Sequence, residues 1–184
     1  MKIRICLTKS KKAFAPYSKA IIWYDKVRYG SDLGASHCAG MFFAESWNRA
    51  LFYHASGKAT NFMGEKTFKE KNQIVETYEL EVCKATGVKL GQACIDREGT
   101  PYAVKQTIGI AIMFAVWAFT LGQVSIENPF ADGDKYVNCL EEWGDILVQN
   151  TGVEPPVGGL EGISVYTFRN WIRSLPYAKQ IEES

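Results

Sequence analysis

Apolar and polar side chains alternate along several short segments in the first half of the chain. Alternation at every second residue is typical of a β-strand with one buried face, and a short continuous apolar segment is typical of a fully buried strand. On this basis we predict strands at residues 2–7, 36–44, 50–55, 58–62 and 73–82.

Apolar residues spaced three and four positions apart predict helices elsewhere in the chain. The first helix begins near Ser18 and ends near Tyr29–Gly30, and further helices are predicted at residues 84–97, 139–150 and 168–175. We expect glycines to break the helix at residues 84–97. Because strands cluster early and helices cluster late, the pattern favours an α+β fold over a doubly wound parallel sheet.

The segment from Gln106 to Ile126 contains no charged residue over its 21 positions. A membrane-spanning helix needs about 20 apolar residues, so its length permits a span. Several polar residues interrupt it, however, and Lys105 is the only basic residue at its flank. We therefore favour a buried central helix and expect membrane contact to be unlikely.

The composition fits one domain of 184 residues, of which 47% are hydrophobic. We expect the core at residues 2–152 and a C-terminal extension at residues 153–184. The formal net charge of +1 excludes a polybasic nucleic-acid binder. The five cysteines are odd in number and no secretory signal is visible, so we expect synthesis in a reducing cytoplasm and no disulfide framework.

Cys139 has the strongest local signal for chemistry. Asn138 is a good helix N-cap, and Glu141 three residues later completes a capping box, which places Cys139 in the first helical turn. The positive end of the helix dipole and the unpaired backbone N–H groups there favour the reactive thiolate. The alternative is a buried cysteine that acts as a small apolar side chain.

Histidine is scarce, since only His37 and His54 are present, on two predicted neighbouring strands. Either could act as the base for a cysteine nucleophile, or both could be ordinary half-buried residues. Cys38 should face the opposite side of its strand from His37. No metal-binding spacing is recognisable and no cofactor is expected. Glu141 and Glu142 are expected on the solvated surface.

Five segments together resemble the permuted branch of the NlpC-like cysteine peptidase superfamily, which has a papain-like core. They match its first helix, its Ser-His strand, the strand after it, a Gly-x-Pro-Tyr element and the nucleophile helix. In this chain they are Ser18–Trp23, Ala35–Met41, Tyr53–Lys58, Gly99–Tyr102 and Tyr136–Glu142. The order and spacing of the segments carry the resemblance, because no one of the motifs is specific.

The resemblance implies a circularly permuted papain-like α+β fold whose antiparallel sheet packs against the nucleophile-bearing helix. It implies Cys139 as nucleophile, His37 as base and His54 as the group that orients His37. Ser36 and Tyr102 are the expected substrate-binding residues. The branch often has an acid where this chain has His54, and its usual Cys-Ser-Glu is Cys-Leu-Glu here.

These expectations imply a cysteine peptidase or amidase, which is a thiol hydrolase that cleaves peptide or amide bonds. Cell-wall peptides (peptidoglycan) are one candidate substrate, and a phage tail or another virion is one candidate setting. One alternative is a non-catalytic structural or interaction module with protein partners in such an assembly. Another is a lipid acyltransferase or thioesterase-like enzyme, because Asn138-Cys139 also echoes the lecithin:retinol acyltransferase group. That alternative predicts an exposed apolar face on residues 107–121.

Overall fold

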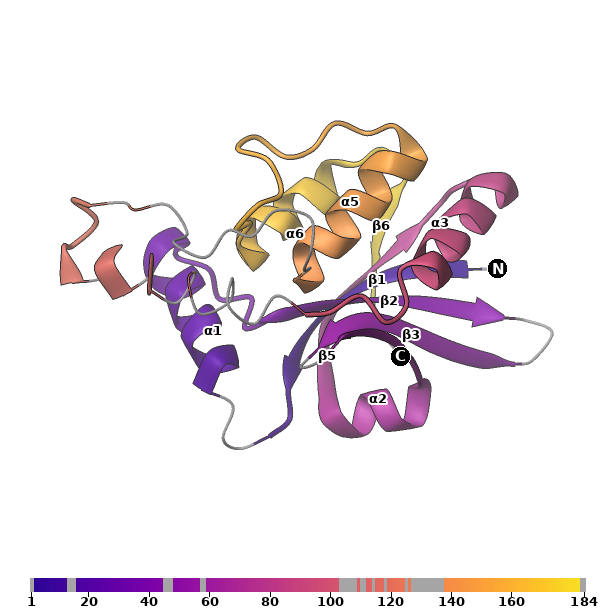
Figure 1. Ribbon diagram of the computed structural model, residues 1–184, viewed down its shortest axis with the longest axis horizontal. Helices are drawn as coiled ribbons and strands as arrows, with labels where there is room; N and C mark the ends of the chain where they lie inside the picture. Colours follow the sequence, from indigo (N-terminus) through magenta and orange to yellow (C-terminus); the bar gives the residue numbers. More distant parts are fainter. Residues whose placement is uncertain are drawn as a thin grey trace.

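The computed structural model describes residues 2–12, 16–44, 48–56, 59–102, 109, 112–113, 115–117, 119–124, 126 and 138–182. These residues form a mixed structure in which one sheet separates two layers of helices (Figure 1). The predicted α+β class is confirmed.

A six-stranded sheet in the order β4-β3-β2-β1-β5-β6 forms the centre of the protein. Every neighbouring pair is antiparallel. The edge strand β6, near the C-terminus, extends the sheet beside β5. The strands are β1 (Lys2–Ser10), β2 (His37–Ala44), β3 (Arg49–Ser56), β4 (Ala59–Gly64), β5 (Asn72–Leu80) and β6 (Ala178–Ile181).

Helices cover both faces of this sheet. On one face α5 lies across β2 and β3, with α3 and α6 beside it, whereas α2 lies on the opposite face (Figure 1). The helix α1 contacts α6 at one end of the molecule. The helices are α1 (Pro16–Tyr29), α2 (Glu65–Lys71), α3 (Lys84–Asp96), α5 (Cys139–Thr151) and α6 (Val165–Ser174).

Two hydrophobic cores follow from this layering. The larger core lies between the sheet and α3, α5 and α6, and includes Cys38, Tyr53 and Trp143. The smaller core lies under α2 and is built around Phe52 and Phe68, whose rings stack with centroids 4.1 Å apart. Alternate residues of each central strand therefore enter different cores.

Most of the predicted helices and strands are present, and they differ from the prediction where packing between distant segments determines the local structure. The glycines do not break α3, because Gly87 lies against Ile3 and the helix runs unbroken from Lys84 to Asp96. The pattern did not predict α2 or β6. Phe168 and Ile172 of the C-terminal segment are fully buried in the larger core.

Only part of the predicted apolar helix at residues 106–126 belongs to the described chain. In that part Phe119 and Leu121 are almost completely exposed, at 88% and 87% of their surface. Among the described residues, no helix has the length and apolar character needed to cross a membrane.

Candidate active site

The N-terminus of α5 is fixed by side chains next to it in sequence. The Asn138 Oδ1 atom accepts hydrogen bonds from the backbone N–H groups of Leu140 and Glu141, each at 3.0 Å. The predicted N-cap is therefore confirmed, and Cys139 is the first residue of the helix.

Cys139 lies at this terminus, buried against the start of β2. Burial raises the pKa of the Cys139 thiol to about 12, although the nearby backbone N–H groups of Cys38, Cys139 and Leu140 act in the opposite direction. The thiol is thus protonated at neutral pH in this arrangement. The effect of desolvation on the thiol pKa therefore outweighs the opposite effect of the helix terminus.

The two histidines form a pair. The Nε2 atom of His37 and the Nδ1 atom of His54 are 3.2 Å apart, and the two rings meet edge to face. Burial, together with the neighbouring His54, lowers the pKa of His37, although part of that side chain remains exposed. Burial and the nearby Lys71 lower the pKa of His54 to about 4. Both rings are therefore neutral near pH 7, and one ring donates its proton to the other.

The His54 ring carries an uncompensated polar atom. Its Nε2 atom is buried and has no hydrogen-bond partner among the described residues. The ring packs edge-on against Phe68 of α2, with centroids 5.3 Å apart. A buried polar atom without a partner costs free energy, so the His54 side chain is placed here at some cost in stability.

The structure brings His37 to His54 but does not bond either to Cys139. Cys38, Gly40 and Phe42 alternate toward α5, so the side chain of Cys38, as predicted, points away from that of His37. Among the described residues, Cys139 contacts β2 through Cys38 and no hydrogen bond joins its sulfur to His37. The peptide group that contacts the sulfur is, however, the one that links His37 to Cys38.

The two expected substrate-binding residues have different surroundings. The hydroxyl of Ser36, directly before His37, lies 2.5 Å from that of Ser18 on α1. Tyr102 follows the isolated bridge between Ala59 and Pro101, and its partly buried ring packs against the larger core. Ser36 therefore lies directly before the strand that bears His37. Tyr102 lies next to the bridge by which Pro101 pairs with Ala59 of β4.

Glu142 is a buried group that sequence reasoning missed. Its carboxylate is fully buried and accepts a hydrogen bond of 2.5 Å from the Tyr53 hydroxyl and one of 3.3 Å from Arg97. Burial raises its pKa, and these two partners oppose the rise. Tyr53 precedes His54, and Glu142 lies one turn beyond Cys139, so this bond ties the cysteine helix to the histidine strand.

The expectation that Glu141 and Glu142 are solvated is therefore wrong. Glu141 is buried at the helix terminus, where it also accepts the backbone N–H of Gly162 at 2.8 Å. Adjacent helical residues differ in direction by only about 100°, so two neighbours can both enter a broad buried face. The signal in the sequence was the position of both acids between Cys139 and Trp143, on a helix with an apolar face.

Gly40 lets α5 approach the sheet closely. A Cβ atom at this position would lie 1.7 Å from the ring of Trp143, so any larger residue would displace the helix. The indole N–H of Trp143 also donates to the Tyr53 carbonyl oxygen at 3.4 Å. Gly40 and Trp143 thus set the height of Cys139 above β2.

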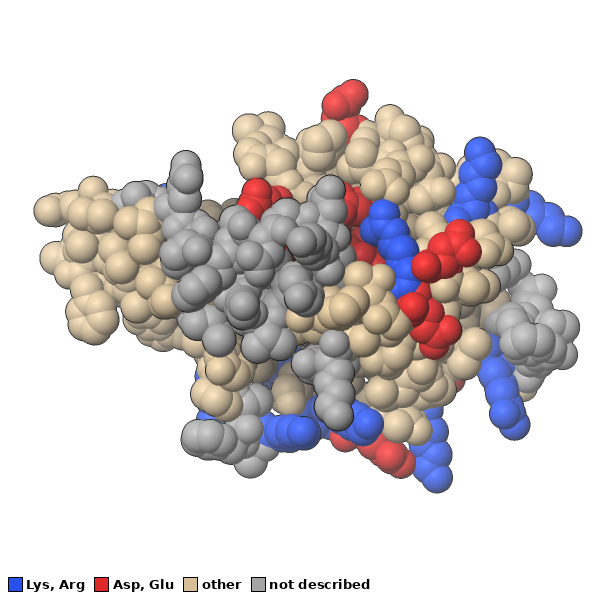
Figure 2. Space-filling model, viewed as in Figure 1, with Lys and Arg blue, Asp and Glu red and all other residues tan. Residues whose placement is uncertain are grey.

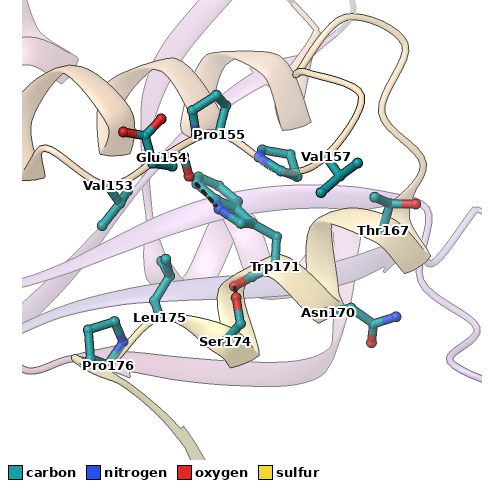
Figure 3. A pocket seen from close by; sticks show the side chains of 11 residues that line it. Val153, Glu154, Pro155, Val157, Thr167, Asn170, Trp171, Ser174, Leu175 and Pro176 are labelled. Carbon is teal, nitrogen blue, oxygen red and sulfur yellow. Dashed lines mark hydrogen bonds between the residues drawn. The ribbon is translucent and has the colours of Figure 1, made fainter.

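A groove lies elsewhere, between α6 and the loop before it (Figure 3). Its volume is about 540 Å³, and Trp171 forms much of its wall, with the indole N–H bonded to the Glu154 carbonyl oxygen at 3.0 Å. Cys139, His37 and His54 do not line it. Its position gives it no part in chemistry at the cysteine.

Metal ligands are sparse around these residues. Within the described ranges, no group of three or more His, Cys, Asp or Glu side chains is placed to hold a metal ion. The histidine pair alone offers two nitrogen atoms, and structural or catalytic zinc sites use at least three protein ligands.

Comparison with known proteins gives a fold relationship. No protein-family model matches the chain, and no curated protein matches it. Among solved structures, the chain is similar to the crystal structure of the metalloprotein yiiX from Escherichia coli O157:H7, DUF1105. The TM-score is 0.61 at 13% sequence identity, and the match covers 100% of this chain and 96% of the other. At this identity the likeness concerns the fold.

Proposed function

We propose that this protein is a thiol hydrolase in which Cys139 attacks an amide carbonyl, His37 is the base and His54 orients His37. We propose with it that the fold is papain-like and circularly permuted. The observation that carries the proposal is the position of Cys139 as the first residue of a helix whose N-terminus is capped by Asn138, with the backbone N–H groups of that terminus beside its sulfur. Such groups can stabilise a thiolate and then an oxyanion.

The structure corresponds to a resting state in this proposal. His37 is bonded to His54 and Cys139 is protonated. His37 lies with His54 and Phe68 on the α2 face of the sheet, whereas Cys38 and Cys139 lie on the α5 face, so the proposal requires the start of β2 to rearrange and bring the imidazole to the thiol. Catalytic hydrogen bonds are often long or poorly aligned before substrate binds.

The chemistry then proceeds in two steps. The Cys139 proton moves to His37, the sulfur forms a bond to the carbonyl carbon, and the C–N bond breaks as the leaving amine takes the proton from His37. Water next attacks the thioester, gives a proton to His37 and releases the acid, while the sulfur recovers its proton. The substrate class is a peptide or amide, and wall peptides attacked by a virion component are the example that the resemblance suggests.

Alkylation of Cys139 by iodoacetamide, followed by mass spectrometry across pH, tests the proposal. A thiol confined to the resting arrangement reacts only at strongly alkaline pH, since its pKa is raised to about 12. If His37 reaches the sulfur, Cys139 reacts below the ordinary thiol pKa of ~8.5, and His37→Ala abolishes this reactivity. Cys94, which is also buried, is the internal control. Reactivity of Cys139 equal to that of Cys94 would refute the proposal.

A non-catalytic role in an assembly is the second candidate. It is favoured by the buried, protonated thiol and by the placement of His37 with His54. The same alkylation experiment separates it from the hydrolase, because it expects no effect of His37→Ala on Cys139.

An acyltransferase or thioesterase acting on lipid is a third candidate. Its support is the exposure of Ile112, Phe119 and Leu121, within the segment where this alternative predicts an apolar face. Acyl transfer from a lipid ester, followed in the wild type and in Cys139→Ser, distinguishes it from amide hydrolysis.

A further inference from the structure

The helix α1 has an inverted arrangement of apolar and polar residues. Its one fully buried residue is Asp25, which is 3% exposed and accepts the Tyr166 backbone N–H at 2.9 Å, at the start of α6. Trp23 and Val27, in contrast, keep 52% and 50% of their surface exposed. An acid therefore anchors the helix to the protein, and large apolar side chains point outward.

The exposed residues form a stripe along the helix. Ala20, Trp23 and Val27 are separated by three and four positions, so they lie on one helical face. Lys19 and Lys26 are exposed beside this face. Lys26 is 3.5 Å from the exposed Asp32, a contact of little energetic weight. The face of α1 is thus apolar along its middle and basic along its edge.

Residues 115–117 and 119–124 add further exposed apolar surface beside α1. Trp117 lies against α1, with the Arg28 guanidinium 5.1 Å from the ring and Tyr24 at 5.7 Å. Phe119 and Leu121, beyond it, extend almost fully into solvent. Figure 1 shows this segment projecting beside α1, and in Figure 2 the projection carries almost no charge on the face shown.

We propose that this surface binds an anionic lipid bilayer. Protruding apolar side chains suit insertion between acyl chains, Trp23 suits the interfacial layer, and the lysines suit anionic headgroups. A second copy of the chain fits less well, because an antiparallel two-fold pairing of α1 helices would place the Lys19 and Lys26 edges of the two copies opposite each other. The protein would lie on the bilayer, contrary to the sequence-based expectation that membrane contact is unlikely. This inference does not depend on activity at Cys139.

Cosedimentation of the full chain with vesicles tests the inference. We expect binding to vesicles of phosphatidylcholine containing phosphatidylglycerol, weaker binding to phosphatidylcholine alone, and a decrease at high salt because screening shortens the range of charge attraction. Replacing both Trp23 and Val27 by Ser should lower the partition coefficient at least about tenfold, and the variant Lys19→Glu with Lys26→Glu should remove the preference for phosphatidylglycerol.

A matched control is available on α3. Val88 and Ile95 are also exposed, at 57% and 56%, and their replacement by Ser should leave vesicle binding unchanged. Circular dichroism verifies that every variant is folded. The proposal is overturned if the protein binds neither type of vesicle. An equal loss of vesicle binding in the α3 control overturns it as well. So do concentration-dependent dimers that dissociate when Trp23 and Val27 are replaced, because they would indicate a contact between copies of the chain.

Discussion

Two helices of this protein, α5 and α1, are built on opposite plans. Eight of the residues of α5 are buried, including both of its first-turn acids, and its ends are closed by Asn138 and Gly152. The helix α1 buries Asp25 fully and exposes Trp23. A helix whose acids are buried with hydrogen-bond partners is part of a rigid core. A helix whose tryptophan faces outward presents an apolar surface that a binding partner outside the chain can contact.

The difference also separates the two proposals. The chemistry at Cys139 depends on α5 being held at a fixed height over β2 and β3. The proposed lipid surface depends on α1 and its neighbouring segment remaining uncovered. Because the residues concerned do not touch, changes in one helix should leave the properties of the other intact.

The largest expected effect contrasts two tryptophans. Trp143 of α5 is fully buried against Gly40, so Trp143→Ala should lower the free energy of unfolding by about 3–5 kcal/mol. Trp23→Ala on α1 should lower it by less than about 1 kcal/mol. Urea denaturation followed by circular dichroism measures both. Similar losses for the two variants would show that α1 packs more tightly than its exposure indicates.

The buried carboxylate gives the next effect. Glu142→Ala leaves the Tyr53 hydroxyl and Arg97 without their partner, and should cost about 2–3 kcal/mol of unfolding free energy. Glu142→Gln, which retains an acceptor for Tyr53, should cost less. The exposed pair of Glu65 and Lys69 provides the control, since Glu65→Ala should change stability by less than about 0.5 kcal/mol. A Glu65 effect as large as the Glu142 effect would contradict the buried network.

Asp25 predicts a dependence on pH that belongs to α1. Burial raises its pKa to about 6. The folded state therefore binds the proton more tightly than the unfolded state, so this contribution to stability is complete below about pH 4 and is lost as the pH rises through 6.

Comparison of the wild type with Asp25→Asn isolates the effect. Between pH 4 and 7 the wild type should lose about 1–2 kcal/mol relative to the variant, measured as the difference between their urea denaturation curves. A constant difference across this range would show that the pKa of Asp25 is the same in the folded and unfolded states.

The smallest effect concerns the cap of α5. Asn138→Ala removes the acceptor for two backbone N–H groups and should cost about 1 kcal/mol, whereas Asn138→Asp should retain most of the stability. If the helix terminus supports the Cys139 thiolate, Asn138→Ala should also slow alkylation of Cys139 at pH 8. An unchanged denaturation midpoint in Asn138→Ala would mean that other contacts hold this terminus.

The parts of the site that could be predicted are those governed by neighbours in sequence. The cap formed by the Asn138 side chain and the glycine that ends α5 involve residues within one turn of each terminus. The strands that bear His37 and His54 followed from alternation, and the adjacency of these strands brought the two rings together, as expected from their order.

The remaining features depend on how the elements are placed. The side from which α5 packs on β3 determines whether the Glu142 carboxylate contacts solvent or the Tyr53 hydroxyl. No pattern of neighbouring residues in the sequence predicts that side. In the same way, one residue of register decides whether His37 or Cys38 faces the Cys139 sulfur, because successive strand residues point to opposite faces.

The sequence by itself therefore determined most of the elements, the α+β class and the capped position of Cys139, since these rest mainly on interactions within a few residues. Only the tertiary structure decided the partners of that cysteine, the burial of Glu142 and the outward face of α1. Those outcomes depend on free energies of burial and pairing between segments far apart in the chain, which exist only once the segments have met.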